Sequence, residues 1–374
     1  MPTRIVPIIS SLTTGGAEMS LLRLCKQQVQ RYQRVTVISL QPKSELYQQF
    51  IDAGVSVVCL DMTKASQLLA VTWKLRSAIK AAKPEIVQSW MYYSNALAAL
   101  ACMGLGIKLI WSIRRTEVPV KSTFSALFMR CCALLSHWLP AKVCYNARAG
   151  ISAHEQFGYA TDKSELIANG FEFVPRSRFD EGRVEARAKL GISTQDTVII
   201  CVARWHPDKG QDLLIQALAS VGNTLADVKL LLVGRDCTES NDELTALITQ
   251  YQLKERVILV GEQMPVSSWL VLADLYCMPS RTEGFPNALV EAMALDVPAV
   301  ATAVGDTPII TETLLQLVPP RADALAEAIT AAVATPATER LQHAVRAGVL
   351  IRQQFAISAC ADSYDKLYRQ VLEC

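Results

Sequence analysis

The chain has 374 residues, of which 51% are hydrophobic and 19% are charged, a composition typical of a globular protein with ample core. No uninterrupted apolar run reaches the roughly 18 residues that a membrane-spanning helix needs. The short apolar run at the amino terminus gives way at once to Ser, Thr and Gly, unlike a secretory signal, so we expect a cytoplasmic protein. The 11 cysteines form neither a Cys-x-x-Cys pair nor a metal-ligand spacing, which predicts reduced thiols and no bound metal.

Charge is divided unevenly along the chain. Residues 1–170 hold 19 Lys and Arg against 9 Asp and Glu, whereas the remaining residues hold 18 against 26. A split of this size predicts two domains and an anionic partner for the first of them. The chain lacks the signature of a nucleic-acid-binding module, and its basic residues are not interleaved with aromatic ones, so we expect no nucleic acid. An anionic membrane surface is the other candidate, which would place the protein at the periphery of the inner membrane face.

Strand-like and helix-like runs alternate through the first half of the chain. The expected strands are Ile5–Ile9, Val35–Leu40, Val55–Leu60, Ile86–Trp90 and Lys108–Ile113, and the expected helices are Met19–Tyr32, one from about Ser44, Gln67–Ala82 and Asn95–Met103. This alternation predicts an α/β fold with a doubly wound parallel sheet.

Two loops of the first half carry residues suited to ligand binding. The glycines Gly15 and Gly16 follow the first strand, where they let backbone approach a ligand closely, although any tight turn uses such a pair. Arg114 and Arg115 follow the fifth strand. They either pair with acidic loop residues or bind a substrate.

A stretch from Lys108 to Lys142 mixes basic and apolar residues. Its apolar spacing from Phe124 to Trp138 predicts a helix that is apolar on more than one side, and such a helix is either core or an interface element. Core is the simpler interpretation. Because the first domain is basic, contact of Phe124, Phe128 or Trp138 with a membrane is the alternative.

The second half begins with a strand, a polar loop and a helix. The strand Val198–Ala203 leads into a loop with Arg204 and Lys209, and the helix Gln211–Ala219 follows. This arrangement brings two cations to the carboxyl edge of a parallel sheet, where open α/β folds bind ligands. We expect these cations to neutralise a diphosphate. The alternative is that both side chains simply face solvent.

The segment Pro279–Ala294 is the most informative part of the chain. It follows the strand-like run Leu272–Met278, and we expect Pro286 to open a helix, because proline suits the first helical turn. Unpaired amides at a helix start attract phosphate. Glu283 before the helix and Glu291 on it would then accept hydrogen bonds from hydroxyls on either side of a diphosphate, which describes a nucleotide sugar. Alternatively, Glu283 is a turn residue and Glu291 a solvated one.

These two glutamates and the residues between them resemble the E-x7-E element of retaining glycosyltransferases. The sequence of this segment resembles that of glycosyltransferase family 4, which has the GT-B fold. In that family the first glutamate contacts the transferred sugar and the second contacts the nucleotide ribose. An arginine and a lysine stabilise the departing diphosphate. The resemblance thus implies that Glu283, Arg204 and Lys209 are catalytic. The donor-binding residues that it implies are Gly16, Gly234, Gly284, Phe285, Pro286, Asn287, Ala288, Leu289 and Glu291.

The resemblance extends over nearly the whole chain. On the acceptor side it implies Gly15, Tyr92, Arg114 and Arg115. Many members of the family carry histidines where this chain has Tyr93 and Arg114, and these departures indicate acceptor chemistry that prefers cations. His154 lies in a helix-and-stop pattern that the family shares, and helix packing or capping explains it.

The resemblance also implies the domain organisation, because residues 167–171 are similar to the hinge of the family. We expect an N-terminal acceptor-binding Rossmann-like domain over residues 1–170 and a nucleotide-sugar-binding Rossmann-like domain over residues 171–355, facing each other across a central cleft. A C-terminal helix within residues 356–374 crosses back to the first domain.

The activity implied is that of a retaining glycosyltransferase. It would move a sugar from a nucleotide-diphosphate donor, such as a UDP-sugar, to a glycan or polyprenyl-linked acceptor in bacterial surface polysaccharide or lipopolysaccharide assembly. No cofactor is expected, since the donor is a substrate. Two alternatives remain open: a sugar-nucleotide epimerase or phosphorylase of the same fold, and a catalytically silent subunit that binds sugar nucleotides.

Overall fold

The computed structural model describes residues 3–31, 33–116 and 124–373. The chain divides into two compact units: unit 1 comprises Met1–Glu172 and Phe355–Cys374, and unit 2 comprises Phe173–Gln354. The boundaries expected from the sequence, at residues 170 and 355, lie within two residues of this division.

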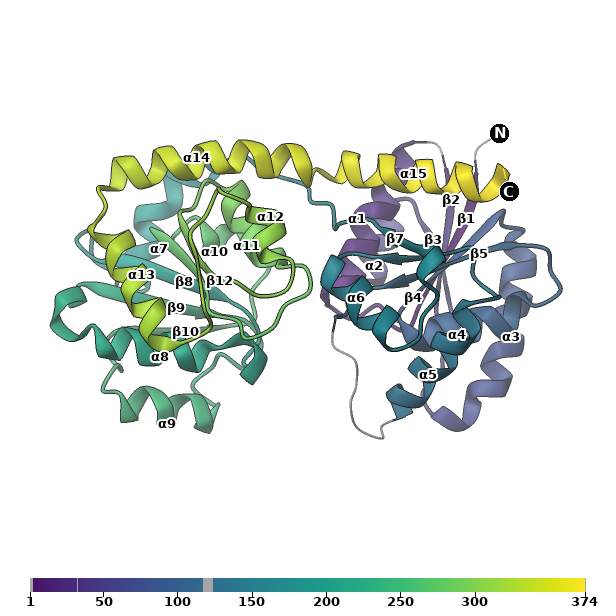
Figure 1. The fold of residues 1–374 in the computed structure, drawn as a ribbon, viewed down its shortest axis with the longest axis horizontal. Helices are drawn as coiled ribbons and strands as arrows, with labels where there is room; N and C mark the ends of the chain where they lie inside the picture. The colour runs from purple at the N-terminus through teal and green to yellow at the C-terminus, as the bar shows by residue number, and fades with distance from the viewer. Residues whose placement is uncertain (1–2, 32, 117–123, 374) are drawn as a thin grey trace. The chain divides into compact units, whose positions relative to one another are not determined.

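Unit 1 is built on a seven-stranded parallel sheet of order β3-β2-β1-β4-β5-β6-β7 (Figure 1). Its strands are β1 Arg4–Ile9, β2 Arg34–Ser39, β3 Ser56–Cys59, β4 Ile86–Trp90, β5 Lys108–Ile113, β6 Lys142–Tyr145 and β7 Ser164–Leu166. Its helices are α1 Gly16–Gln30, α2 Tyr47–Asp52, α3 Leu68–Ala82, α4 Tyr92–Cys102, α5 Phe124–Ser136, α6 Arg148–Gln156 and α15 Ile357–Glu373. β4 is buried along its whole length, as expected for a strand of a parallel sheet that is covered on both faces.

Helices cover both faces of this sheet, so two hydrophobic cores form. One core joins the sheet to α3, α4 and α5, and the other joins it to α1, α2 and the C-terminal helix α15. A buried polar chain also fixes α15, because the Gln28 side chain donates to the Tyr368 hydroxyl, which donates to Gln88 on β4. Gly170 is needed for this packing: a Cβ there would lie 2.6 Å from Cys360 Cβ on α15.

Unit 2 contains a six-stranded parallel sheet of order β10-β9-β8-β11-β12-β13. Its strands are β8 Thr197–Val202, β9 Val228–Val233, β10 Val257–Gly261, β11 Leu275–Met278, β12 Ala299–Thr302 and β13 Leu317–Val318. Its helices are α7 Arg183–Lys189, α8 Gln211–Ser220, α9 Asp242–Gln250, α10 Ser267–Leu270, α11 Asn287–Ala294, α12 Thr307–Thr311, α13 Ala322–Ala334 and α14 Ala337–Gln354. One core joins the sheet to α8, α9 and α13, while α11 packs against α10 and α14.

Both sheets have a topological switch point, where successive connections leave in opposite directions. In unit 1 it lies between β1 and β4, and in unit 2 between β8 and β11. Ligands of doubly wound folds bind outside the carboxyl ends of the strands at such a point. A ligand site is therefore expected in the loops that follow these four strands.

The alternation expected from the sequence is confirmed, with small shifts at element ends. α4 begins at Tyr92 instead of Asn95 because Met91 takes φ 71° and ψ 164°, which turns the chain directly from strand to helix. The run expected as a strand from Leu272 begins pairing only at Leu275, because residues 267–273 form α10 and turns. Among the helices of the described residues, none is both long enough and apolar enough to cross a membrane.

Candidate functional site

Two loops of unit 2 meet at the switch point, one after β8 and one after β11. The Arg281 amide donates to the Asp208 carbonyl over 2.7 Å, and the Arg281 guanidinium pairs with both carboxylate oxygens of Asp212 at 2.6 and 2.7 Å. Gly210 makes this approach possible. It has φ +64°, and a Cβ at this position would lie 2.1 Å from the Pro279 carbonyl oxygen. The two loops thus form one connected surface.

An ion pair joins the two loops at this surface. Lys209 Nζ lies 2.8 Å from Glu283 Oε1, and the same oxygen accepts a hydrogen bond from the Ser280 hydroxyl over 2.7 Å. The Lys209 side chain is 25% exposed and that of Glu283 is 12% exposed. Two of the three residues predicted to be catalytic are therefore in direct contact, one from each loop.

The amino terminus of α11 faces the same switch point. The helix begins at Asn287, one residue later than predicted, and Pro286 precedes it as the N-cap. The Asn287 amide donates to the Phe285 carbonyl over 3.0 Å, and the amides of Ala288 and Leu289 follow in the first turn, where helical amides lack an intrahelical partner. Of the three amides predicted to bind an anion, at residues 287–289, that of Asn287 is therefore already engaged.

Several predicted donor-binding residues are buried. Phe285, Pro286 and Leu289 have buried side chains. The Gly284 carbonyl accepts a hydrogen bond from the Asp306 amide over 3.2 Å. These residues shape the loop, while the amides of the helix start and the two glutamates carry its polar groups.

Glu291 lies on the first turns of α11, four residues after its start. Burial raises the pKa of Tyr276 on β11 well above its usual value, and the carboxylates of Glu283 and Glu291 both act in the same direction. The two predicted glutamates are therefore both within electrostatic reach of one buried phenol on β11.

Arg204, the third residue predicted to be catalytic, is exposed at the end of β8. Within the described part of the chain its guanidinium has no hydrogen bond or ion pair. Gly234, which follows β9, packs against the main chain of this loop: its φ is +147°, and a Cβ would lie 2.1 Å from the Ala203 carbonyl oxygen. Close packing therefore accounts for a glycine at this position.

A third loop, after β12, belongs to the same surface and was missed from the sequence. Gly305 has φ +55°, and a Cβ there would lie 2.0 Å from the Glu283 carbonyl oxygen. Thr307 is fully buried, and its hydroxyl has no hydrogen-bond partner among the described residues. The run Gly305–Pro308 carries the ordinary signals of a turn followed by a helix, and no residue pattern distinguishes it from other turns.

In unit 1, the predicted glycine loop forms the N-cap of α1. Gly15 is the N-cap residue and Gly16 starts the helix. The Glu18 carboxylate folds back over this end, since a Cβ on Gly15 would lie 2.4 Å from Glu18 Oε2. Burial raises the pKa of Glu18, while a hydrogen bond from its own main-chain amide lowers it.

Tyr92 is buried, and its hydroxyl lies 2.8 Å from His154 Nε2. His154 Nδ1 lies 2.7 Å from the Gly150 carbonyl, which can only accept. Nδ1 therefore carries the proton, and the Tyr92 hydroxyl donates to Nε2. Burial lowers the pKa of His154, and the hydrogen bond to Gly150 acts in the opposite direction. His154 is a core residue, in agreement with helix packing, and Tyr92 holds it there.

Arg114 is engaged inside unit 1. Its guanidinium stacks 4.5 Å from the centroid of the Trp90 ring, donates to Asn169 over 3.0 Å, and contacts the Tyr364 hydroxyl on α15. Asn169 also accepts a hydrogen bond from Ser20 on α1. Arg114 thus ties β5, α1 and α15 together, and its side chain performs a packing role that the acceptor assignment did not anticipate. Arg115 is exposed.

The apolar helix predicted from Phe124 is observed as α5. Phe128 is partly buried against the core and stacks on Tyr93 with the ring centroids 4.6 Å apart, whereas Trp138 is exposed. Lys121 and the Phe124 side chain lie outside the described residues. This stretch therefore contains a residue that packs against the core, Phe128, and an exposed one, Trp138.

The cysteines and acidic residues bear on the expectation of no metal. Ten cysteines of the described residues are free thiols, and burial raises the pKa of Cys277 to about 12. No group of three or more His, Cys, Asp or Glu within the described ranges is arranged to hold a metal ion.

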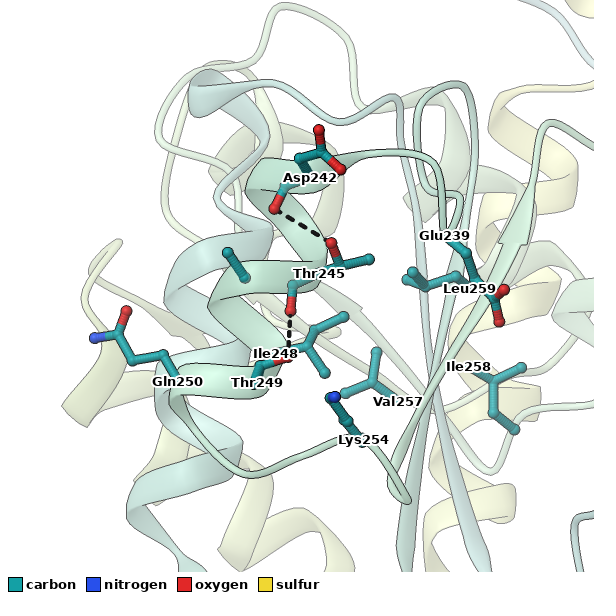
Figure 2. A pocket seen from close by; sticks show the side chains of 11 residues that line it. Glu239, Asp242, Thr245, Ile248, Thr249, Gln250, Lys254, Val257, Ile258 and Leu259 are labelled. Atoms are coloured by element: carbon teal, nitrogen blue, oxygen red, sulfur yellow. Dashed lines mark hydrogen bonds between the residues drawn. The ribbon is translucent and has the colours of Figure 1, made fainter.

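Two cavities of unit 2 lie away from these loops. A cavity of about 1000 Å³ runs between α9 and β10, with Thr245 and Thr249 of α9 on one side and Val257 on the other (Figure 2). A second, of about 390 Å³, lies near the start of β11 at Leu275. Neither contains a predicted site residue. The chemistry of the loops, and not cavity size, therefore identifies the candidate site.

Comparison with known families agrees with this geometry. Residues 14–173 match the family described as Glycosyltransferase Family 4, and residues 182–348 match the family described as Glycosyl transferases group 1. One match lies almost wholly in unit 1 and the other in unit 2. The chain belongs to glycosyltransferase family 4.

Curated relatives match parts of this family 4 chain. D-inositol 3-phosphate glycosyltransferase of Segniliparus rotundus is 32% identical over 224 residues, which are 57% of this chain and 49% of that protein. The lipopolysaccharide core biosynthesis mannosyltransferase LpsB of Rhizobium meliloti is 31% identical over 126 residues, 33% of this chain and 36% of that protein. The match thus spans half or less of the length of these relatives.

Solved structures match the family 4 chain over nearly its whole length. Anabaena HepE, solved in complex with UDP and glucose, has a TM-score of 0.82 at 22% identity and covers 98% of this chain and 99% of its own. WaaG, a glycosyltransferase involved in lipopolysaccharide biosynthesis, has a TM-score of 0.73 at 18% identity and covers 96% and 98%. At these identities the likeness shows the fold, which is GT-B with two Rossmann-like units.

Proposed function

We propose that the chain is a retaining glycosyltransferase. It moves a sugar from a nucleotide-diphosphate donor to a glycan or lipid-linked acceptor, with donor binding in unit 2 and acceptor binding in unit 1. The observation that carries this proposal is the contact of Lys209 with Glu283 at the switch point of unit 2. It joins a cation suited to a diphosphate to a carboxylate suited to sugar hydroxyls, beside a helix start with open amides.

Catalysis in this proposal is electrostatic. When the bond between the anomeric carbon and the diphosphate oxygen breaks, negative charge grows on the diphosphate. Lys209, Arg204 and the amides of Ala288 and Leu289 stabilise that charge, and such preorganised donors are among the largest contributors to catalysis. The acceptor oxygen forms the new bond on the same face of the sugar, and its proton passes to the departing diphosphate oxygen. The cations perform the role that a metal ion has in other transferases, so the reaction needs none.

Glu283 and Glu291 divide the recognition of the donor. Glu283 accepts hydrogen bonds from the transferred sugar, and Glu291 accepts them from the ribose. Glu283 has one oxygen already bonded to Lys209 and Ser280. A sugar hydroxyl that reaches this carboxylate is therefore fixed next to the cation that meets the diphosphate.

The donor is a UDP-sugar in this proposal, supported by the fold shared with HepE, whose structure holds UDP and glucose. The acceptor belongs to bacterial surface polysaccharide assembly, supported by the partial match to LpsB, a lipopolysaccharide core mannosyltransferase. A lipid-linked acceptor places unit 1 at an anionic membrane surface, consistent with its excess of basic residues.

Product analysis tests the proposal. The protein is incubated with a panel of nucleotide sugars and a polyprenyl-diphosphate-linked glycan, and mass spectrometry follows the acceptor. We expect a gain of one sugar, release of the nucleoside diphosphate, and the same anomeric configuration as in the donor by NMR. Inversion of that configuration would contradict the retaining assignment.

The alternatives give other products. An epimerase or phosphorylase would convert or release sugar at a rate independent of acceptor, and a silent subunit would bind a nucleotide sugar without turnover. The direct contact between Lys209 and Glu283 favours turnover over silence, because a purely binding subunit does not need a cation held at the leaving group.

A further inference from the structure

The outer surface of α3 carries an exposed stripe of unusual composition. Leu69, Trp73, Arg76 and Lys80 follow the spacing i, i+4, i+7 and i+11, which places them along one side of a helix. The core-facing residues Val71, Leu75 and Ile79 lie on the opposite side. Leu69 is 81% exposed and Trp73 is 72% exposed.

The α5 segment repeats this spacing. Leu127, Cys131, Leu134 and Trp138 follow the same i, i+4, i+7 and i+11 pattern, with Arg130 beside them. Leu134 and Trp138 are 63% and 69% exposed. α3 and the segment formed by α5 and the turn after it, which holds Trp138, thus present large apolar side chains outward at the same spacing.

α4 connects the two stripes. It packs against both α3 and α5, and the three helices lie beside one another on one face of the sheet (Figure 1). Two apolar residues near the carboxyl end of α4, Leu100 and Met103, are exposed. Arg76 of the α3 stripe donates to the Ala101 and Met103 carbonyls over 2.8 and 2.7 Å. The exposed side chains of these three neighbouring helices, together with Trp138, are here named the α3–α5 face.

The charge on this face has one sign. The sequences of α3, α4 and α5 contain no Asp or Glu, whereas they contain Lys74, Arg76, Lys80 and Arg130. Lys74, Lys80 and Arg130 are exposed. Large apolar side chains, two of them tryptophans, interspersed with cations match the interface of an anionic bilayer, where apolar groups enter the headgroup boundary and cations meet the lipid charge.

We infer that the α3–α5 face is the surface with which this protein docks on an anionic membrane. This inference rests on the proposed function, because it takes the acceptor to be lipid-linked. From the sequence, the membrane contact was expected at Phe124, Phe128 or Trp138, whereas the structure points to a different set of side chains. Phe128 packs inward. The residues that enter the bilayer are Leu69 and Trp73 of α3 together with Leu134 and Trp138.

Vesicle sedimentation of the full chain tests the docking surface. The charge variant is Lys80→Gln with Arg130→Gln, and its control is Lys366→Gln with Arg369→Gln. The control pair is exposed on α15, which covers the other face of the sheet. Both variants remove two cations from unit 1, so their net charges are equal. Vesicles contain phosphatidylglycerol in phosphatidylcholine, or phosphatidylcholine alone.

We expect wild type to pellet with anionic vesicles and not with neutral ones at low salt. The Lys80 and Arg130 variant should bind about 30-fold more weakly, at about fivefold for each neutralised charge, while the α15 variant changes binding less than threefold. Leu69→Ser with Trp73→Ser should remove the binding that persists at high salt, and Leu372→Ser on α15 should not. Those outcomes support the inference.

Other outcomes overturn it. Equal losses in the two charge variants would mean general attraction with no docking surface, and absence of pelleting would exclude the membrane. A concentration-dependent dimer in sedimentation velocity that dissociates on Leu69→Ser with Trp73→Ser would show that the face joins two copies. Thermal shift with nucleotide sugars on the same samples separates the two proposals: donor binding without vesicle binding refutes docking alone, and vesicle binding without donor binding refutes the proposed function alone.

Discussion

The contact between Lys209 and Glu283 gives the most specific prediction. Lys209→Met leaves the Glu283 carboxylate, which is 12% exposed, with the Ser280 hydroxyl as its one side-chain donor among the described residues. Losing a hydrogen bond to a buried charged group costs about 2 kcal/mol. Glu283→Gln keeps an acceptor for Ser280 and should cost about half as much. Because the two residues touch, the double variant should cost about 1 kcal/mol less than the two single variants together.

A matched control is available in the same unit. Arg352 pairs with Asp296 over 2.7 Å, with side-chain exposures of 31% and 18%. Asp296 follows the carboxyl end of α11, whereas the site lies at its amino end. Arg352→Met should therefore destabilise unit 2 by a similar amount and leave turnover unchanged.

Turnover separates a structural pair from a catalytic one. Removing the Lys209 cation should lower kcat by roughly two powers of ten, the scale found when one donor to a developing charge is lost. Thermal denaturation and initial rates are measured on the two single variants, the double variant and Arg352→Met. If Lys209→Met loses stability as Arg352→Met does and keeps wild-type kcat, the pair is structural and the assignment of the leaving-group site is wrong.

Four further predictions follow from the site and its surroundings. Glu291→Ala should raise the donor KM with little change in kcat, because a ribose contact persists through the reaction; a fall in kcat alone would contradict this. Gly210→Ala should destabilise unit 2 by more than about 1 kcal/mol in thermal denaturation, since φ is positive and the Cβ meets the Pro279 carbonyl; an unchanged melting temperature would refute the packing argument. Chelator should not change the rate, and full dependence on a divalent ion would overturn the metal-free mechanism. His154 has a lowered pKa, so the unfolded state takes up its proton first and stability should fall as pH drops below about 6.5; His154→Gln should lose part of this slope, and an unchanged slope would show that His154 does not cause it.

Much of the fold was predictable because hydrophobic periodicity and turn residues determine it. The run Ile86–Trp90 begins with Ile and Val and ends with Trp, and it is a strand with the predicted bounds that is buried along its whole length. Element ends were less predictable. Met91 takes a positive φ that side chains rarely adopt, and nothing in its residue type indicates that α4 starts directly after it.

The candidate site was partly predictable for the same reason. Glu283 and Lys209 lie in loops whose position follows from the order of strands and helices, so their proximity could be expected. The environment of Arg114 could not, because it depends on Tyr364, which lies 250 residues away in the chain. The loop of Gly305 was missed since its role arises from close packing against Glu283, a contact that no local pattern encodes.

The stripe on α3 shows a related limit. Leu69 and Trp73 fit a helical pattern, and from the sequence alone they are indistinguishable from residues that pack against a neighbour. Only the fold shows that Val71, Leu75 and Ile79 already face the core and that Leu69 and Trp73 are left outside it.

The central claim is that the loops after β8 and β11 bind a nucleotide-diphosphate sugar, and thermal shift with a nucleotide-sugar panel tests it most directly. A donor present at about 100 times its Kd stabilises the folded state by about 2.7 kcal/mol, which for a unit of this size raises Tm by roughly 5–10 °C. We predict such a rise for wild type and for Arg352→Met, and its loss in Glu291→Ala. A panel in which no nucleotide sugar or nucleoside diphosphate raises Tm, or in which Glu291→Ala responds as wild type does, would contradict the account.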